Sequence, residues 1–170
     1  DEAHCISQWG HDFRPAYRSI HILHSLCPQA STIALSATAT KQVLKDIEEQ
    51  LELKKPKLFK SSFFRENLTY KTYQTEDKNY KIKTLLEKSR GSALIYVGSR
   101  LATQQLAKTL SVNGFSCGFY HGGMSNKEKE QQYKQWMNNE NKVMVATNAF
   151  GMGIDKSDVS TVIHTHIPES

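Results

Sequence analysis

Four short apolar runs that alternate with amphipathic stretches constrain the fold more than any other feature of this sequence. The run from Ala93 to Val97 is continuously apolar, which is typical of a strand covered on both faces. Further β-rich runs occupy residues 115–120, 143–146 and 159–164, and helical patterns separate the first three runs. This alternation predicts a parallel sheet with helices on both faces.

Local signals place the helices between these runs. Leu106 and Leu110 share one helical face, and Gly114 is placed to end that helix. Ser125 and Glu128 have the spacing of a capping box, which predicts that another helix begins there.

The first third of the chain carries weaker signals of the same class. Pro15 suits the first turn of a helix that runs to about Leu26. Residues 31–35 and 58–64 are β-leaning and are predicted as strands. Between them, a second helical face is predicted from Val43, Leu44, Ile47 and Leu51.

A domain boundary is expected near residues 62–67, where the pattern restarts. Residues 1–62 are interpreted as the C-terminal part of one α/β domain. Residues 63–170 are interpreted as a second, nearly complete one. The chain is expected to be a fragment of a longer protein.

Composition excludes several classes of protein. No apolar run approaches the length of a membrane span, and no signal-peptide pattern is present. The three cysteines form no CxxC pair, so neither a zinc site nor a disulfide framework is indicated. Lys and Arg number 22 against 17 Asp and Glu, a net charge of +5 that suits a polyanionic partner only weakly.

The tetrapeptide Asp1-Glu2-Ala3-His4 is the first signal of chemistry. In phosphoryl transfer, one carboxylate can hold Mg²⁺ while another orients and deprotonates an attacking water. A pair of solvated acids is the plainer alternative for these residues taken alone.

A short loop after this pair combines aromatic and basic side chains. Trp9, Phe13 and Arg14 are the residue types that stack on unpaired bases. The alternative is that the two aromatic residues only anchor the loop to the core.

Ser36, Ala37 and Thr38 follow a predicted strand and precede a helix. The hydroxyl groups of Ser36 and Thr38 suit a switch that senses domain closure. The alternative is an ordinary helix cap.

In the second part, polar residues follow the predicted strands, where ligands bind in open α/β sheets. Ser99 and Arg100 follow one strand, and Thr147 follows another. Further along, Gly151 would let the backbone approach a phosphate or sugar, and Asp155 can accept from a hydroxyl. His121, at a third strand end, is interpreted as structural.

The order and spacing of these motifs resemble the RecQ family of superfamily 2 DNA helicases. "DEAHCISQWGHDFRPAY" is similar to that family's acidic box and aromatic-rich loop, and "SATAT", "IYVGSR", "YHGGMS" and "VATNAFGMGIDK" are similar to its later motifs in order. The resemblance covers essentially the whole chain.

The resemblance implies roles for the first group of residues. Asp1 would coordinate Mg²⁺, Glu2 would activate water, and His4 would couple the nucleotide site to DNA binding. The loop that senses single-stranded DNA would contain Trp9, Phe13 and Arg14, and the motif that couples hydrolysis to strand separation would contain Ser36, Ala37 and Thr38.

The resemblance implies two roles in the second part. Gly151 and Asp155 would face the nucleotide. The DNA backbone would be contacted by Ser99, Arg100 and Thr147.

The fold class implied is α/β, with two RecA-like parallel-sheet units of which the first is truncated. The longer protein would be an ATP-dependent 3′–5′ DNA helicase that uses ATP and Mg²⁺ and acts on single-stranded and partly duplex DNA. It would be cytoplasmic, at the bacterial nucleoid, or nuclear in a eukaryote, without a membrane partner. A DEAH-box RNA helicase and a non-catalytic nucleic-acid-binding module of the same fold remain alternatives.

The sequence contains no GxxxxGK[ST] loop to cradle the β- and γ-phosphates. The family's arginine finger belongs to a later motif that the chain is expected not to reach. The isolated chain is therefore predicted not to hydrolyse ATP.

Overall fold

The structure, a computed structural model, describes residues 1–9, 13–62, 64–151 and 154–167. The chain divides into two compact units, residues 1–69 and 70–169. Within the described ranges, none of the helices is long and apolar enough to span a bilayer.

The second unit is built on a four-stranded parallel sheet in the order β2-β3-β1-β4. Its strands are β1 (Ser92–Tyr96), β2 (Cys117–Tyr120), β3 (Val143–Ala146) and β4 (Val159–His164). Each strand lies where the sequence predicts one, so the predicted parallel sheet is confirmed. Because all strands run the same way, their carboxyl ends meet at one edge.

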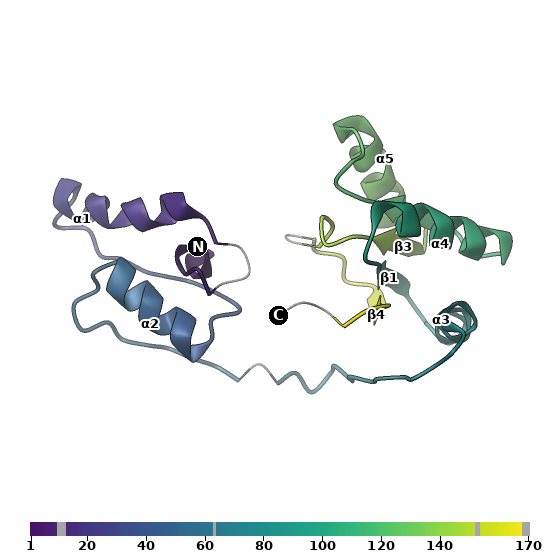
Figure 1. Cartoon of the computed structure of the whole chain (residues 1–170), viewed down its shortest axis with the longest axis horizontal. Coiled ribbons are helices and arrows are strands. Elements are labelled where there is room, and N and C mark those ends of the chain that lie inside the picture. The colour runs from purple at the N-terminus through teal and green to yellow at the C-terminus, as the bar shows by residue number, and fades with distance from the viewer. Residues whose placement is uncertain (10–12, 63, 152–153, 168–170) are drawn as a thin grey trace. The chain divides into compact units, whose positions relative to one another are not determined.

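Helices cover both faces of this sheet (Figure 1). On one face, α3 (Lys78–Glu87) and α4 (Arg100–Val112) pack on the odd-numbered residues of β1, such as Ile95. On the other face, α5 (Asn126–Met137) places the buried Trp136 against Leu94 and Met144. Strand side chains alternate between faces, so the continuously apolar run supplies both cores.

Polar side chains fix where these helices begin. The predicted capping box of α5 is present: Ser125 Oγ accepts from the Glu128 amide, and the Glu128 carboxylate accepts from the Ser125 amide at 2.8 Å. At α3, which lacked a predicted cap, Asp77 accepts from the Tyr80 amide.

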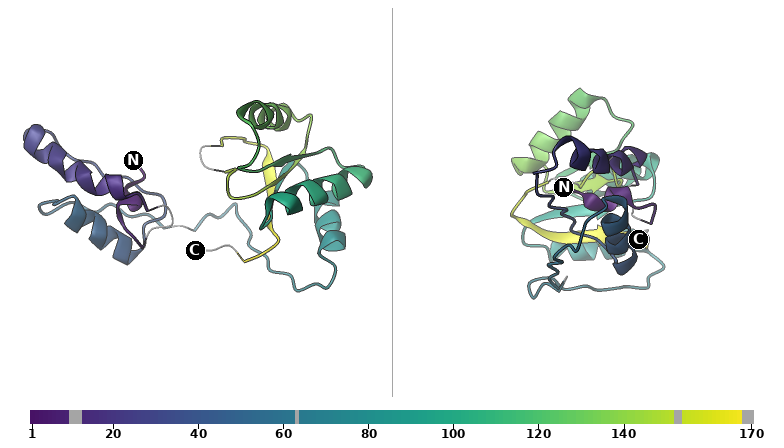
Figure 2. Two further views of the ribbon diagram at one scale, coloured as in Figure 1. Left: turned by 45° about the horizontal axis from the view of Figure 1, so that its top comes forward. Right: turned by 90° about the vertical axis from the view of Figure 1, so that its left-hand side faces the viewer.

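The first unit contains two 3₁₀ helices, η1 (Ala3–Ile6) and η2 (Pro15–His21), and two α-helices, α1 (Ile22–Leu26) and α2 (Lys41–Gln50). Figures 1 and 2 show the η2–α1 segment and α2 lying side by side. Their shared core contains Ala3, Ile6, Ala39, Val43, Ile47 and Leu51. The predicted helices over residues 15–26 and 43–51 are therefore confirmed, although the first begins as a 3₁₀ turn.

The strands predicted over residues 31–35 and 58–64 are wrong for the described part of this unit. Both runs carry no strand assignment, and Ile33 and Phe59 are 78% and 89% exposed. A β-leaning run forms a strand only when a neighbouring chain pairs with its backbone. Here the first run makes a backbone bond to η1 instead, from the Ala3 amide to the Leu35 carbonyl at 2.8 Å.

Candidate functional site

The acidic pair lies exposed at the start of η1, with a backbone conformation that few residues adopt. Glu2 has φ 52° and ψ 42°, in the left-handed region. Its amide donates to Asp1 Oδ1 at 2.9 Å. A non-glycine residue in this region costs about 1–3 kcal/mol, and such strain clusters at functional sites.

His4 joins the acidic pair to the Ser-Ala-Thr motif. Its buried ring places Nδ1 3.3 Å from Glu2 Oε2 and 3.1 Å from Ser36 Oγ. The Thr38 amide donates to the same hydroxyl oxygen at 3.4 Å. A proton on Nδ1 would therefore be shared between the carboxylate and the hydroxyl, which links two segments 32 positions apart.

The acidic pair can bind a magnesium ion through one carboxylate, together with phosphates of a bound nucleotide. Within the described ranges, no group of three or more His, Cys, Asp or Glu side chains could hold a metal ion. Mg²⁺ usually keeps several waters and binds through one or two carboxylates together with substrate phosphates. The exposed Asp1 carboxylate supplies a hard oxygen ligand of that type.

The aromatic residues after η1 do not belong to the apolar core of their unit. Trp9 is 68% exposed and Phe13 is 37% exposed. The Arg18 guanidinium lies 5.0 Å from the centroid of the Phe13 ring. The Arg14 amide donates to the Cys5 carbonyl at 2.8 Å, which anchors the far end of the loop. The core-anchor alternative is thus disfavoured for Trp9.

In the second unit, three predicted residues lie at the carboxyl edge of the sheet. Ser99 Oγ accepts from the Ala102 amide at 3.1 Å, so it caps α4. Thr147 follows β3, the strand between β1 and β2, and its amide donates to the Tyr120 carbonyl at 3.2 Å. The structure brings the end of β3 beside the ends of β1 and β2.

The Arg100 side chain lies over the turn that follows β2. A Cβ atom added at Gly123 would stand 2.8 Å from Arg100 Nη1 and 3.2 Å from its Cδ. A side chain at position 123 would require Arg100 to shift. The predicted phosphate-binding cation therefore lies against a glycine that the sequence motifs did not single out.

His121 is buried at the start of the same turn, as its structural interpretation predicts. Its Nε2 lies 3.3 Å from the Gln104 amide nitrogen, and its backbone amide contacts Met124 Sδ at 3.3 Å. Its Nδ1 has no hydrogen-bond partner in the described part of the chain.

A tyrosine that the sequence analysis missed holds the segment after β3. Tyr96 Oη donates to the Phe150 carbonyl at 2.9 Å. Burial raises the pKa of Tyr96, so the hydroxyl stays a donor at neutral pH. A Cβ added at Gly151, which has φ +149°, would stand 2.6 Å from this oxygen. Gly151 thus makes room for Tyr96, a packing role beside its predicted place facing the nucleotide.

A polar cluster anchors the other side of this segment. The Lys156 side chain is only 4% exposed, and its Nζ lies 2.5 Å from Asp158 Oδ1 and 2.8 Å from Asn139 Oδ1. The bond from Lys156 lowers the pKa of Asp158 below its usual value. Ser92 Oγ also donates to Asp158, at 2.9 Å. Asp155, the predicted nucleotide contact, lies exposed beside this anchor.

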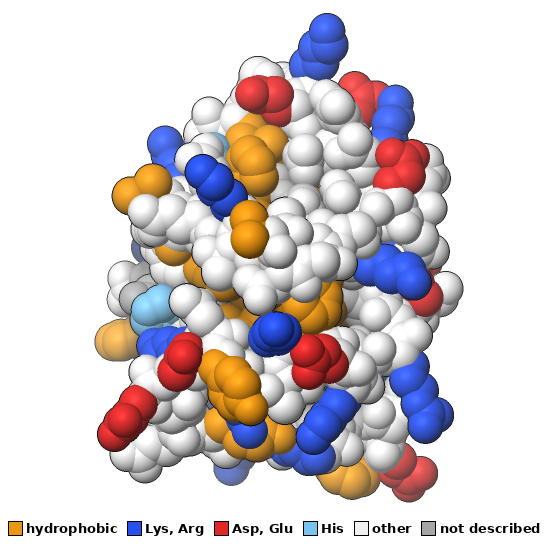
Figure 3. Space-filling model, turned by 90° about the vertical axis from the view of Figure 1, so that its right-hand side faces the viewer, with side chains coloured by type: hydrophobic (Ala, Val, Ile, Leu, Met, Phe, Trp, Pro, Cys, Tyr) orange, Lys and Arg blue, Asp and Glu red, His pale blue; other side chains and the backbone are white. Residues whose placement is uncertain are grey.

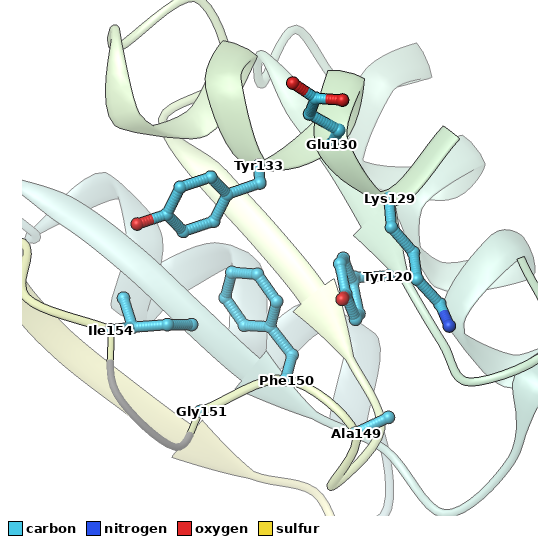
Figure 4. Close-up of a pocket in the computed structure, with 8 residues that line it drawn as sticks. All are labelled: Tyr120, Lys129, Glu130, Tyr133, Ala149, Phe150, Gly151 and Ile154. Carbon is cyan, nitrogen blue, oxygen red and sulfur yellow. The ribbon is translucent and has the colours of Figure 1, made fainter. Parts of the chain in front are cut away.

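An aromatic pocket of about 310 Å³ lies beside the same segment. Figure 4 shows the Phe150 ring between Tyr133 and Tyr120, with Lys129 and Ile154 on opposite sides. Both tyrosine rings are inclined to the Phe150 ring, at 55° for Tyr120 and 61° for Tyr133. Phe150 forms the buried floor of this pocket, because it is 3% exposed and also packs on Trp136.

On the face shown in Figure 3, Lys and Arg side chains are interspersed with acidic ones and gather in no single basic patch. A polyanion on that face would meet no concentrated positive field.

Residues 77–170 match the family model described as the helicase conserved C-terminal domain. The chain is 44% identical to an ATP-dependent DNA helicase RecQ of Bacillus subtilis over 171 residues, which cover 99% of this chain and 29% of the relative. It is 40% identical to a RecQ-like DNA helicase BLM of Xenopus laevis over 175 residues, which cover 100% of this chain and 13% of the relative. The chain thus spans less than a third of these relatives.

A solved structure of Saccharomyces cerevisiae Dbp5, bound to RNA and ADP BeF3, matches 100% of this chain and 44% of its own, with a TM-score of 0.74 and 20% identity. This likeness concerns the fold alone, and it confirms the predicted RecA-like α/β class. The family match leads to one assignment: the chain belongs to the helicase conserved C-terminal domain family, and it is similar over its whole length to RecQ helicases.

Proposed function

We propose that this chain is the central portion of an ATP-dependent DNA helicase motor that moves 3′ to 5′ on single-stranded DNA and separates duplexes. The contact of His4 with both Glu2 and Ser36 carries this proposal. This contact connects Glu2, the carboxylate suited to activating water, with Ser36 of the motif suited to coupling hydrolysis to strand separation. The direction of movement and the choice of DNA rest on the RecQ likeness.

The proposed domains are those expected from the sequence. Residues 1–62 would be the C-terminal part of the first RecA-like domain, and residues 63–170 would belong to the second. The longer protein would act at the bacterial nucleoid or in a nucleus, depending on its source.

In the proposed reaction, Mg²⁺ bound with ATP would neutralise charge that develops on the transferred phosphoryl group. Asp1 would supply one oxygen ligand to that ion. Glu2 would accept a proton from the attacking water as its oxygen bonds to the γ-phosphorus and the bond to ADP breaks. His4 would hold the Glu2 carboxylate in place through Nδ1 and report its state to Ser36.

In the second unit, Ser99, Arg100 and Thr147 would contact phosphates of the single strand without reading bases. Gly151 and Asp155 would face the nucleotide.

In the first unit, the single strand would be sensed by stacking on Trp9, Phe13 and Arg14. The coupling motif would consist of Ser36, Ala37 and Thr38.

The test is nucleic-acid-stimulated ATP hydrolysis by the full-length protein that contains this chain, with single-stranded DNA and RNA compared. Stimulation by DNA that Glu2→Gln abolishes is the expected result. Preferential stimulation by RNA would favour a DEAH-box RNA helicase. Binding without hydrolysis would favour a non-catalytic binding module.

A further inference from the structure

The backbone at Trp9 is tied to a helix far along the chain. Ser7 precedes Trp9 and is 1% exposed. Its hydroxyl donates to Asp46 Oδ2 on α2 at 2.5 Å. The Trp9 amide donates to the same Ser7 oxygen at 3.1 Å. A continuous path of hydrogen bonds therefore runs from the α2 carboxylate to the backbone of Trp9.

Asp46 lies on a helix that is packed against the core of the first unit. It stands on α2 between Val43 and Ile47, which are 2% and 5% exposed in the core that also holds Ile6. The side-chain amide of Gln42 donates to the second carboxylate oxygen, Oδ1, at 3.1 Å. Both oxygens thus have a donor, and the carboxylate is held in one orientation.

The direction of these bonds gives Asp46 a specific task. A serine hydroxyl has a single hydrogen, and donation to Asp46 turns its lone pairs toward other donors. The Trp9 amide uses one of them. Without an acceptor at position 46, the hydroxyl hydrogen is free to turn, and the oxygen no longer presents a fixed lone pair to Trp9. A carboxylate is itself a poor contact for a polyanion, which favours a positioning role over DNA binding.

We infer that Asp46 is a positioning residue for Trp9, and that through Ser7 it sets the position from which the exposed Trp9 ring meets single-stranded DNA. The DNA part of this inference rests on the proposed function. Asp46 lies outside every motif that the sequence analysis singled out.

The experiment compares variants in the full-length protein: Asp46→Ala, Asp46→Asn, Ser7→Ala and the double alanine variant. In Asp46→Ala, the DNA concentration for half-maximal ATPase stimulation is expected to rise about tenfold or more, because tenfold is the lower end of the effect of losing a hydrogen bond to a charged group. Basal ATPase is expected to stay within about twofold, because Asp46 does not contact the acidic pair. Asp46→Asn should restore most of the stimulation, since its amide oxygen accepts from the same hydroxyl. The double variant should be no worse than either single one.

The matched control is Glu49→Ala on the same helix. Glu49 is 59% exposed and pairs with Lys45 in the adjacent turn. It should leave DNA stimulation unchanged.

A second measurement, hydrogen exchange of the Trp9 amide, separates the positioning role of Asp46 from the proposed role of Trp9 in DNA binding. Exchange should speed up about tenfold or more in Asp46→Ala while α2 amides keep their protection. An unchanged Trp9 amide, or equal losses of basal and stimulated ATPase with a lower melting temperature, would overturn the positioning role. If the wild-type protein shows no DNA stimulation, the proposed function fails, and the exchange result alone decides the role of Asp46.

Discussion

The Arg100 guanidinium lies over Gly123, where a side chain as small as a methyl group would meet Nη1 at 2.8 Å. Two strand ends that are separated along the chain thereby form one surface. The cation predicted to bind phosphate packs against the glycine of the neighbouring turn.

This relationship predicts the effect of Gly123→Ala. The added Cβ should displace Arg100, weaken single-stranded DNA binding for all sequences and lower the salt slope by about one phosphate contact. Fluorescence anisotropy of labelled oligonucleotides across a salt series, with the full-length protein, measures both. Gly122→Ala is the matched control, because its Cβ would meet only the Ala149 Cβ at 3.8 Å. Equal losses in both variants would place the DNA track elsewhere.

Gly151→Ala is expected to destabilise the protein. Its φ of +149° disfavours an L side chain, and the Cβ would stand 2.6 Å from Tyr96 Oη. We expect a loss of about 1–3 kcal/mol in the free energy of unfolding, measured by urea denaturation.

The companion variant Tyr96→Phe leaves the Phe150 carbonyl without its donor, for an expected loss of about 0.5–1.5 kcal/mol. Removing the hydroxyl also removes the clash, so the double variant should lose less than the sum of the two. Simple additivity would mean that Tyr96 and Gly151 are not coupled.

The sequence predicted the second unit well because its signals are local. Strand periodicity and the capping box at Ser125 act within a few residues, and both are confirmed. The predictions of strands over residues 31–35 and 58–64 were wrong because a strand also needs a pairing partner, which the local sequence does not reveal.

In the candidate site, too, the residues with local sequence signals were predicted and those that act through long-range contacts were not. The sequence motifs singled out His4, Ser36 and Arg100. The structure adds that His4 contacts Ser36. Tyr96, Gly123 and Asp46 were missed because each acts through a contact to a residue far away in sequence, without a local pattern.

The Lys156–Asp158 pair predicts a loss of stability in acid. The bond from Lys156 lowers the folded-state pKa of Asp158 below 3.8, its usual value. The pair therefore contributes its full stability above that value, and the contribution is lost as pH falls through the lower folded pKa.

Unfolding free energies measured by urea denaturation from about pH 5 down to about pH 2 should fall more steeply for the wild type than for Asp158→Asn. The asparagine variant has no charge to lose at this position. Parallel curves would show that the pair contributes nothing in this range.

The isolated 170-residue chain should not hydrolyse ATP, because its sequence lacks the GxxxxGK[ST] loop. A phosphate-release assay with and without single-stranded DNA measures this. DNA-stimulated hydrolysis that disappears in Glu2→Gln would contradict the prediction.

The most direct test of the helicase assignment is strand separation by the full-length protein on duplexes with a single-stranded tail. We expect ATP-dependent unwinding of a 3′-tailed DNA duplex, little unwinding of a 5′-tailed one, and loss of activity in Glu2→Gln with DNA binding retained. Unwinding that survives in Glu2→Gln, or a preference for the 5′ tail, would contradict the proposed helicase mechanism.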